Sequence, residues 1–597
     1  MNPLQRGFIP APGVTENTVL LEAIIKRAKA ESGELSVAFL DLAKAFDTVS
    51  HDLVRKGMER FQIPDHMVEV VMDMYHGATT SFTVKNGTSG PIRIGSGVRQ
   101  GDPLSPILFD MALDPLFCLL AEEGRPWQAG TASVSAMGYA DDTAVLSDSV
   151  GGMQENLRLV SQFCQEVGLQ LNVRKSFAFH IKAGSKTFLV NQCEDFLVHG
   201  EPIPWVGPEE TTKYLGQYFG PWRGLEKPQL KEKTHTWGKR VQKAPLKPKQ
   251  KVEVWRSTIL PRLASALQNT KASKAQLDEL DGIARQYVRQ ALHLPDQVTV
   301  HLFYAPCSAG GLGLIELAQH VPRVDRKALM ALHNSPCEHV KALAQALKVK
   351  VPEPLVRTDH VRLWSELPRQ GKGAETWAGV PSCNFWLTSD VLSPAEFTAA
   401  LQVRTNTYPT RDTIGLYASI DVRCRRCGLT NETIGHVSGF CPKMKRCRIK
   451  RHDSICRLFC QKATGVGWVV EWEPHFHHED RLYKPDLVCV KGNRVVLVDP
   501  TVVWDEDLAA LRRAKAAKEE KYKVLVEALT RKYSKNGSEP EVHIFGLPIG
   551  CRGGWIPEND EVLSTLRLMK RSTTKALTIR ALGGTLRLLK SFTDGYF

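Results

Sequence analysis

Three aspartates stand where a metal site for phosphoryl chemistry would need them. Asp141 and Asp142 lie side by side between the largely apolar runs 137–140 and 143–146, which predicts a β-hairpin whose turn carries the acids. Asp41 follows the apolar run 37–40, at the point where a buried strand would end. A nucleotidyl transferase needs carboxylates presented in this way, because two Mg²⁺ ions about 3.5 to 4 Å apart must be held beside the attacking hydroxyl and the incoming phosphates. Asp-Asp pairs are common in ordinary turns, so the prediction depends on Asp41 as well.

A second pair of acids brackets another predicted hairpin. Two apolar runs flank Gly492-Asn493, a dipeptide suited to a tight turn. Counting outward from that turn places Asp486 opposite Asp499, with Cβ atoms about 4.5 to 5.5 Å apart. Like charges at that distance are destabilising unless a cation lies between them, which predicts a divalent metal. The alternative is an unconnected surface acid at each end of the hairpin.

A third group has the spacing of a zinc site. The pattern is C-x2-C-x8-H-x4-C, formed by Cys424, Cys427, His436 and Cys441. Four such ligands at short intervals can close a tetrahedral structural Zn²⁺ site, although Cys447, Cys456 and Cys460 lie close enough to compete as ligands. Basic residues surround the group, so a module that binds nucleic acid is favoured over a purely structural one. They are Arg423, Arg425, Arg426, Lys443, Lys445, Arg446, Arg448, Lys450 and Arg451.

Composition agrees with a polyanionic partner. The 597 residues carry a formal net charge of +14, which is the electrostatic footprint expected of a nucleic-acid-binding protein. The 14 cysteines are unevenly spread, which favours metal ligands in a reducing compartment over disulfides. No apolar run reaches the roughly 18 residues that a membrane span needs, so no membrane partner is expected.

The acid positions resemble motifs A and C of reverse transcriptases. Motif A is Phe39-Leu40-Asp41 with Phe46, and motif C is Tyr139-Ala140-Asp141-Asp142. Segments in the same order resemble the rest of the family: 97–106 is similar to motif B, 168–176 to motif D, 214–216 to the primer-grip motif E, and 4–10 with 16–18 to an early fingers motif. Helices are expected over 16–30, 47–61 and 65–75.

The resemblance implies roles for single residues. Asp41 and Asp141 would be the principal Mg²⁺ ligands, with Asp142 beside them. Phe46 matches an aromatic steric gate that excludes a ribose 2′-hydroxyl. The residues expected to bind template or nucleotide are Arg99, Gln100, Gly101 and Lys175.

The acids Asp486 and Asp499 resemble the core of PD-(D/E)xK nucleases, with one departure. Thr501 stands two residues after the second acid, where that pattern has lysine. Asp505 is expected to cap a helix running to about residue 533. In restriction-like endonucleases of non-LTR elements the lysine is displaced onto this helix, which implies that Lys521 or Lys518 takes the role.

Together the motifs predict a multidomain α+β protein. The expected domains are reverse transcriptase fingers and palm (1–225), a helical thumb (226–330), a linker (331–422), a CCHC zinc knuckle (423–446) and a restriction-like α/β nuclease (447–597). The expected thumb carries a basic series with interleaved tryptophans, suited to phosphate backbones. These residues are Lys231, Lys233, Lys239, Arg240, Lys243, Lys247, Lys249 and Lys251, with Trp237 and Trp255.

This order resembles the Pol proteins of site-specific non-LTR retrotransposons, closest to the R-two clade that inserts into ribosomal RNA genes. The resemblance implies target-primed reverse transcription in the nucleus, with element RNA, target genomic DNA and dNTPs as partners and Mg²⁺ and Zn²⁺ as cofactors. It also implies that further fingers strands and a DNA-recognition module precede residue 1, so the chain is expected to be a fragment. Two alternatives remain: a cellular reverse transcriptase such as telomerase or an intron maturase, and a catalytically inactive scaffold that binds nucleic acid.

Overall fold

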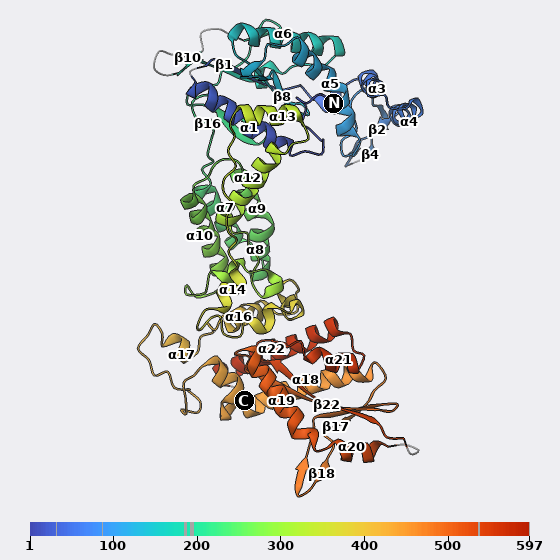
Figure 1. Ribbon diagram of the computed structural model, residues 1–597, viewed down its shortest axis with the longest axis vertical. Helices are drawn as coiled ribbons and strands as arrows, with labels where there is room; N and C mark the ends of the chain where they lie inside the picture. The colour runs from blue at the N-terminus through green and yellow to red at the C-terminus, as the bar shows by residue number, and fades with distance from the viewer. Residues whose placement is uncertain (32, 86, 184–187, 192–195, 535–537, 596–597) are drawn as a thin grey trace. The chain divides into compact units, whose positions relative to one another are not determined.

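The computed structural model of the chain describes residues 1–597 except 32, 86, 184–187, 192–195, 535–537 and 596–597. The chain forms two units, each made of several segments (Figure 1). The first contains residues 1–229, 264–274 and 318–356, and the second contains residues 230–263, 275–317 and 357–597. Among the described residues, no helix has both the length and the apolar character needed to cross a membrane.

A five-stranded antiparallel sheet lies at the centre of the first unit. Its strand order is β11 (Phe188–Asn191), β10 (Phe177–Ala183), β1 (Leu35–Leu40), β9 (Asp142–Ser147) and β8 (Ala136–Tyr139). All six residues of β1 are buried, which explains why this strand is a continuous apolar run without alternation. The helices of this unit include α1 (Gly13–Ala30), α2 (Ala45–Thr48), α3 (His51–Arg60), α4 (Asp65–Tyr75), α5 (Ser105–Glu122), α6 (Val150–Val167), α12 (Leu317–His333) and α13 (Glu338–Ala346). The expected helices near 16–30, 47–61 and 65–75 are thus confirmed as α1, α3 and α4, with α3 beginning four residues later than expected.

The second unit joins a helical region to a four-stranded sheet. The helical region includes α7 (Lys231–Lys243), α8 (Pro248–Val254), α10 (Lys274–Ala291) and α16 (Pro394–Arg404). The first residue of α10 is assigned to the first unit and the rest of that helix to the second. The sheet order is β17 (Val469–Trp472), β20 (Leu487–Lys491), β21 (Arg494–Val503) and β22 (Glu541–Gly550), with only the β21–β22 pair parallel. Around it lie α18 (Lys445–Thr464), α19 (Leu508–Lys523), α20 (Val526–Tyr533), α21 (Asn559–Thr565) and α22 (Lys570–Asp594).

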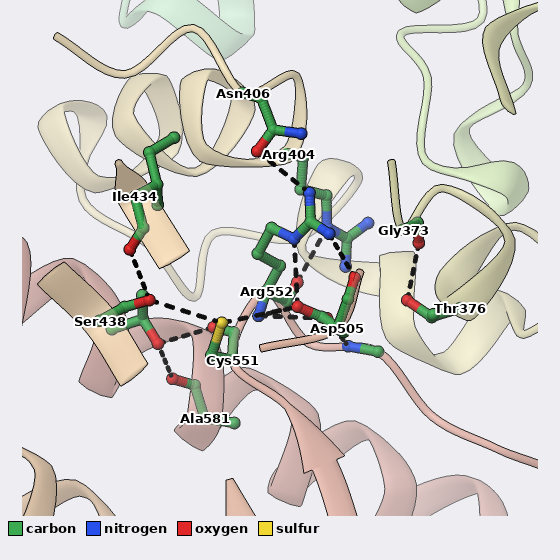
Figure 2. Close-up of polar contacts among 12 residues, drawn as sticks. Gly373, Thr376, Arg404, Asn406, Ile434, Ser438, Asp505, Cys551, Arg552 and Ala581 are labelled. Atoms are coloured by element: carbon green, nitrogen blue, oxygen red, sulfur yellow. Dashed lines mark hydrogen bonds and ion pairs between the residues drawn. The ribbon is translucent and has the colours of Figure 1, made fainter. Parts of the chain in front are cut away.

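A buried ion pair between Asp505 and Arg552, extended by Arg404, connects segments that are far apart in the sequence (Figure 2). Arg552 Nε lies 3.1 Å from Asp505 Oδ1, and both side chains are fully buried. Arg404, at the end of α16, donates to the Arg552 carbonyl over 3.1 Å. Burying two charges is costly unless their hydrogen bonds are satisfied, so removing either partner of this pair is expected to destabilise the unit. Through Arg404 and Asn406 it connects the expected linker with Arg552 of the expected nuclease.

Asp505 therefore does not cap the following helix, contrary to the sequence-based expectation. The cap of α19 is Asp507, whose side chain accepts a hydrogen bond from the Ala510 N–H. The helix also ends at Lys523, and a separate helix, α20, covers 526–533. Two acids two residues apart are equally suited to capping by type, and the tertiary partner Arg552 decides between them.

Candidate functional site

Asp41, Asp141 and Asp142 lie at one edge of the first sheet. In the β8–β9 hairpin Tyr139 pairs with Asp142, so Ala140 and Asp141 form its two-residue turn. Leu40 pairs with Thr143 in the neighbouring strand, which brings Asp41 beside Asp142 one step further along. The hairpin that the sequence predicts is thus present, with Asp142 as the first residue of β9.

The electrostatics of this cluster suit a divalent cation. Burial raises the pKa of Asp141 and of Asp142, and repulsion from neighbouring carboxylates, Asp41 among them, raises both further. Lys213 offsets part of this effect at Asp142. Carboxylate oxygens are the donors that Mg²⁺ prefers, and its charge would relieve the repulsion. The three aspartates therefore offer the donor chemistry that suits a Mg²⁺ site.

Hydrogen bonds from the N-terminal segment stabilise the conformation of the turn. Ala140 has φ of +54°, a left-handed conformation that is costly for a residue with a side chain. Buried Gln5 satisfies its backbone on both sides: Gln5 Nε2 donates to the Ala140 carbonyl over 3.2 Å, and the Ala140 N–H donates to Gln5 Oε1 over 2.9 Å. Asn17 Nδ2 donates to the Gly138 carbonyl over 3.0 Å. Gln5 is a site residue that sequence reasoning missed, and the only signal was its place in the segment similar to a fingers motif.

The segment similar to motif B lies against the residues that follow Asp41. The Val98 N–H donates to the Phe46 carbonyl over 2.8 Å, and Gln100 Nε2 donates to Asp47 Oδ1 over 2.9 Å. The Phe46 ring stacks on Phe109, with ring centroids 4.3 Å apart. Stacking on Phe109 fixes the orientation of the Phe46 ring.

The remaining expected nucleotide and template residues are exposed. Arg99 places its guanidinium 5.6 Å from the centroid of the Tyr75 ring, and Gly101 has φ of +88° with open space around its Cα. Lys175 is exposed on a short 3-10 turn, Val173–Lys175. Asn172 immediately precedes this turn, and its N–H donates to the Asp41 carbonyl over 2.8 Å. The segment similar to motif D is therefore attached directly to the strand end that carries Asp41.

Asp110 is a buried acid whose charge interacts with that of Asp141. Asp110 of α5 is 1% exposed, and neither carboxylate oxygen has a hydrogen-bond partner among the described residues. Burial, and then the charges of Asp141 and Asp114, raise the pKa of Asp110 to about 8. Because this pKa lies above the unfolded value, the folded state retains a proton that the unfolded state loses between about pH 4 and pH 8, so stability falls as the pH rises through that range.

Asp110→Asn removes this penalty. We expect the variant to be more stable than the native chain at pH 8 by about 1–3 kcal/mol, and the difference to shrink towards pH 5. Urea midpoints of both proteins, measured at the two pH values without divalent metal, test this. A difference that is the same at pH 5 and pH 8 would show that ionisation of Asp110 plays no part.

The cysteine and histidine group converges on one point in the second unit. Ligand atoms of Cys424, Cys427, His436 and Cys441 all lie within 4.8 Å of one another. The Cys424 and Cys441 sulfurs are 4.0 Å apart, and Cys427 Sγ lies 3.3 Å from His436 Nε2. Tetrahedral Zn²⁺ with bonds of about 2.0 to 2.3 Å separates its ligands by about 3.3 to 3.8 Å, so the donors fit this ion. His436 Nδ1 lies 3.1 Å from Thr430 Oγ1, a contact that orients the ring.

The nearby cysteines do not join this group. Within the described residues, the cluster contains only the four expected ligands, and Cys456 lies instead beside His452 on α18. Glu432, fully buried, accepts hydrogen bonds from the Arg425 backbone and guanidinium and from the Arg411 N–H. This acid closes the loop that carries the first two ligands.

The second pair of acids lies at the expected register. Lys491 pairs with Arg494 and Leu487 with Val498 in the β20–β21 hairpin, which is the pairing counted from the Gly492-Asn493 turn. Asp486 immediately precedes β20, and Asp499 lies within β21. Burial raises the pKa of Asp486, and the charge of Asp499 adds to this. Continuing the register places Asp486 opposite Asp499, and two carboxylates on neighbouring strands suit a divalent cation such as Mg²⁺.

The structure distinguishes the two candidate lysines. Lys518 of α19 places Nζ 2.6 Å from Asp499 Oδ1, and that aspartate side chain is almost fully buried. Lys521 instead donates to the Tyr522 hydroxyl over 2.9 Å. Only the first lysine therefore contacts the acid pair directly.

In the basic region expected to be a thumb, some lysines form ion pairs with acidic side chains and others are exposed. Lys231 pairs with Glu279 at 2.6 Å and Lys249 with Asp390 at 2.9 Å. Trp255 is fully buried and stacks on Tyr287, so it belongs to the core and is not free to contact nucleic acid. Lys233, Lys239, Arg240, Lys243 and Lys247 are exposed.

Comparison with known proteins decides the family. A family model described as reverse transcriptase (RNA-dependent DNA polymerase) matches residues 1–219. The Pol polyprotein of the type-1 retrotransposable element R2 from Popillia japonica is 31% identical over 95% of this chain and 81% of its own length. The chain belongs to the R2 retrotransposon Pol proteins. It is the reverse transcriptase of an R2-type non-LTR element, not a telomerase or an intron maturase.

Other R2 relatives are longer than this chain. The R2 Pol polyprotein of Nasonia vitripennis is 29% identical and that of the R2DM element of Drosophila melanogaster is 27% identical, each over 99% of this chain. The chain spans 58% and 57% of their respective lengths. This R2-type chain therefore corresponds to just over half of each of those two proteins.

Proposed function

We propose that this R2-type reverse transcriptase inserts its element into a ribosomal RNA gene by target-primed reverse transcription in the nucleus. A nuclease site at Asp486 and Asp499 nicks one DNA strand, and the polymerase site at Asp41, Asp141 and Asp142 extends the freed 3′-hydroxyl on the element's RNA. The observation that carries this proposal is the presence in one chain of both acid clusters, the second with Lys518 at 2.6 Å from Asp499.

In the polymerase site the three aspartates would hold Mg²⁺, which supplies charge stabilisation for phosphoryl transfer. The primer 3′-hydroxyl attacks the α-phosphate of a dNTP in line and pyrophosphate leaves. Phe46, fixed by its stack on Phe109, would exclude a ribose 2′-hydroxyl. Arg99, Gln100, Gly101 and Lys175 would line the path of template and nucleotide.

In the nuclease site Asp486 and Asp499 would hold Mg²⁺ beside the scissile phosphate. Water attacks phosphorus, the bond to the 3′-oxygen breaks, and the products are a 3′-hydroxyl and a 5′-phosphate. Lys518 is the better placed of the two lysines to orient the water and to stabilise charge on the phosphate. A 3′-hydroxyl is the end that the polymerase needs, so the product of the first reaction is the substrate of the second.

The zinc knuckle and the basic helices would hold the substrates. Cys424, Cys427, His436 and Cys441 would bind Zn²⁺ and fold a small module with exposed arginines and lysines around it. The exposed lysines of α7 would attract phosphate backbones without reading sequence.

The test is a coupled assay with the whole chain, element RNA, dNTPs and Mg²⁺ on a supercoiled plasmid carrying the ribosomal target. We expect nicked circles and cDNA covalently joined to the nicked strand. A second substrate, a duplex already nicked at the target, separates the two reactions. Extension of the nicked duplex without nicking of the plasmid would refute the nuclease. Binding of both substrates without either product would favour the inactive scaffold.

A further inference from the structure

A histidine that the sequence did not single out lies within the proposed nuclease site. His452 is on α18, and its Nε2 is 3.0 Å from Asp486 Oδ2. The same nitrogen is 3.0 Å from the carbonyl oxygen of Pro500, the residue after Asp499 in β21. A ring nitrogen, a carboxylate oxygen and a backbone carbonyl thus converge from three different elements of the second unit.

In this structure both contacts are hydrogen bonds of the imidazole, and the same distances also suit neighbouring ligands of one metal ion. Two ligands bound at about 2.1 Å and at right angles to each other are about 3.0 Å apart. Nε2 stands at this separation from both oxygens, so the nitrogen could bind the same ion as either of them.

The other ring nitrogen also has a carboxylate neighbour. His452 Nδ1 faces the carboxylate of Asp453, with Oδ1 at 3.4 Å. A carboxylate at the far nitrogen fixes the ring orientation and directs the other nitrogen to the metal. Cys456, one turn further along α18, is buried and has its sulfur 3.7 Å from Nε2, which limits rotation of the ring.

We propose that His452 is a third protein side chain in the nuclease metal site, where it binds the ion together with Asp486 and the Pro500 carbonyl. This inference rests on the proposed nuclease function. A nitrogen donor in a site otherwise made of oxygens strengthens binding of transition metals more than binding of Mg²⁺, because imidazole suits the former and oxygen ligands suit the latter. The nuclease site is therefore expected to bind Mn²⁺ at least about tenfold more tightly than Mg²⁺.

The test uses Mn²⁺ as the probe and electron paramagnetic resonance as the readout. The protein is the whole zinc-loaded chain with Asp41→Ala and Asp141→Ala, which remove the polymerase metal site. Bound Mn²⁺ is expected to show modulation from a directly coordinated ¹⁴N nucleus. His452→Ala should remove that modulation and weaken Mn²⁺ binding at least about tenfold, while Cys456→Ala keeps the ¹⁴N signal. The matched control is His477→Ala, at an exposed histidine of the same unit.

The outcomes separate this inference from the proposed function. If Mn²⁺ binds, depends on Asp486 and Asp499, and shows no ¹⁴N modulation, the nuclease site stands and the role of His452 is refuted. If no Mn²⁺ binds to the chain lacking the polymerase acids, both are refuted. Because the ¹⁴N measurement is made first on a chain with His452 intact, the test does not depend on folding of the His452→Ala variant.

Discussion

Asp141→Asn abolishes primer extension by this R2-type reverse transcriptase, with an expected loss of at least about 1,000-fold. The amide keeps the shape of the side chain and removes the negative charge that would hold Mg²⁺. The residue lies at the tip of the β8–β9 hairpin beside Asp41 and Asp142, so its charge is one of the three that the proposed site uses. The measurement is Mg²⁺-dependent extension of a DNA primer on an RNA template.

The same preparation should nick supercoiled DNA at the native rate, because the second acid pair belongs to the other unit of the chain. The matched control is Asp148→Asn, which changes an exposed acid just after the opposite end of β9 and should leave extension unchanged. Equal losses in the two variants would mean that the strand is damaged. Residual extension above 10% of the native rate in Asp141→Asn would remove this aspartate from the metal site.

Both acid clusters could be predicted because each depends on local geometry. A hairpin with a two-residue turn determines which residues face each other, so the partner of Asp486 follows from the position of the Gly492-Asn493 turn. The continuous apolar run before Asp41 similarly predicts a buried strand with the acid at its end. Such patterns need no knowledge of the rest of the fold.

What could not be predicted depends on contacts between distant segments. Gln5 supports the Ala140 turn from 135 residues away. His452 of α18 contacts Asp486 although β17, β18 (Phe476–His478) and β19 (Arg481–Tyr483) lie between them in the sequence. Neither has a distinctive neighbourhood in the sequence. For Asp505 the local pattern gave a wrong prediction: its type suits a helix cap, but the side chain forms a buried ion pair with the distant Arg552. Residue type restricts the possible roles, and the tertiary fold selects among them.

The choice between the two lysines is the sharpest case, because they lie three residues apart on one helix and have the same chemistry. Lys518→Ala is expected to lower the nicking rate by about 100- to 1,000-fold, since its ammonium contacts Asp499 at 2.6 Å and would stabilise charge on the phosphate. Lys521→Ala is the matched control and should change the rate less than about threefold, because that lysine contacts Tyr522 instead.

Single-turnover nicking of supercoiled plasmid measures both lysine variants, and primer extension on a pre-nicked duplex reports whether the chain is intact. Removing Lys518 also leaves the buried Asp499 carboxylate without its ion-pair partner, so the variant should lose some stability. Lys518→Arg separates the two effects: it restores the charge and the stability, but its planar guanidinium cannot take the place of a compact ammonium beside the attacking water. Full nicking by Lys518→Arg would show that the lysine only pairs with Asp499. A larger loss in Lys521→Ala than in Lys518→Ala would reverse the assignment and place the functional ammonium one turn further along α19.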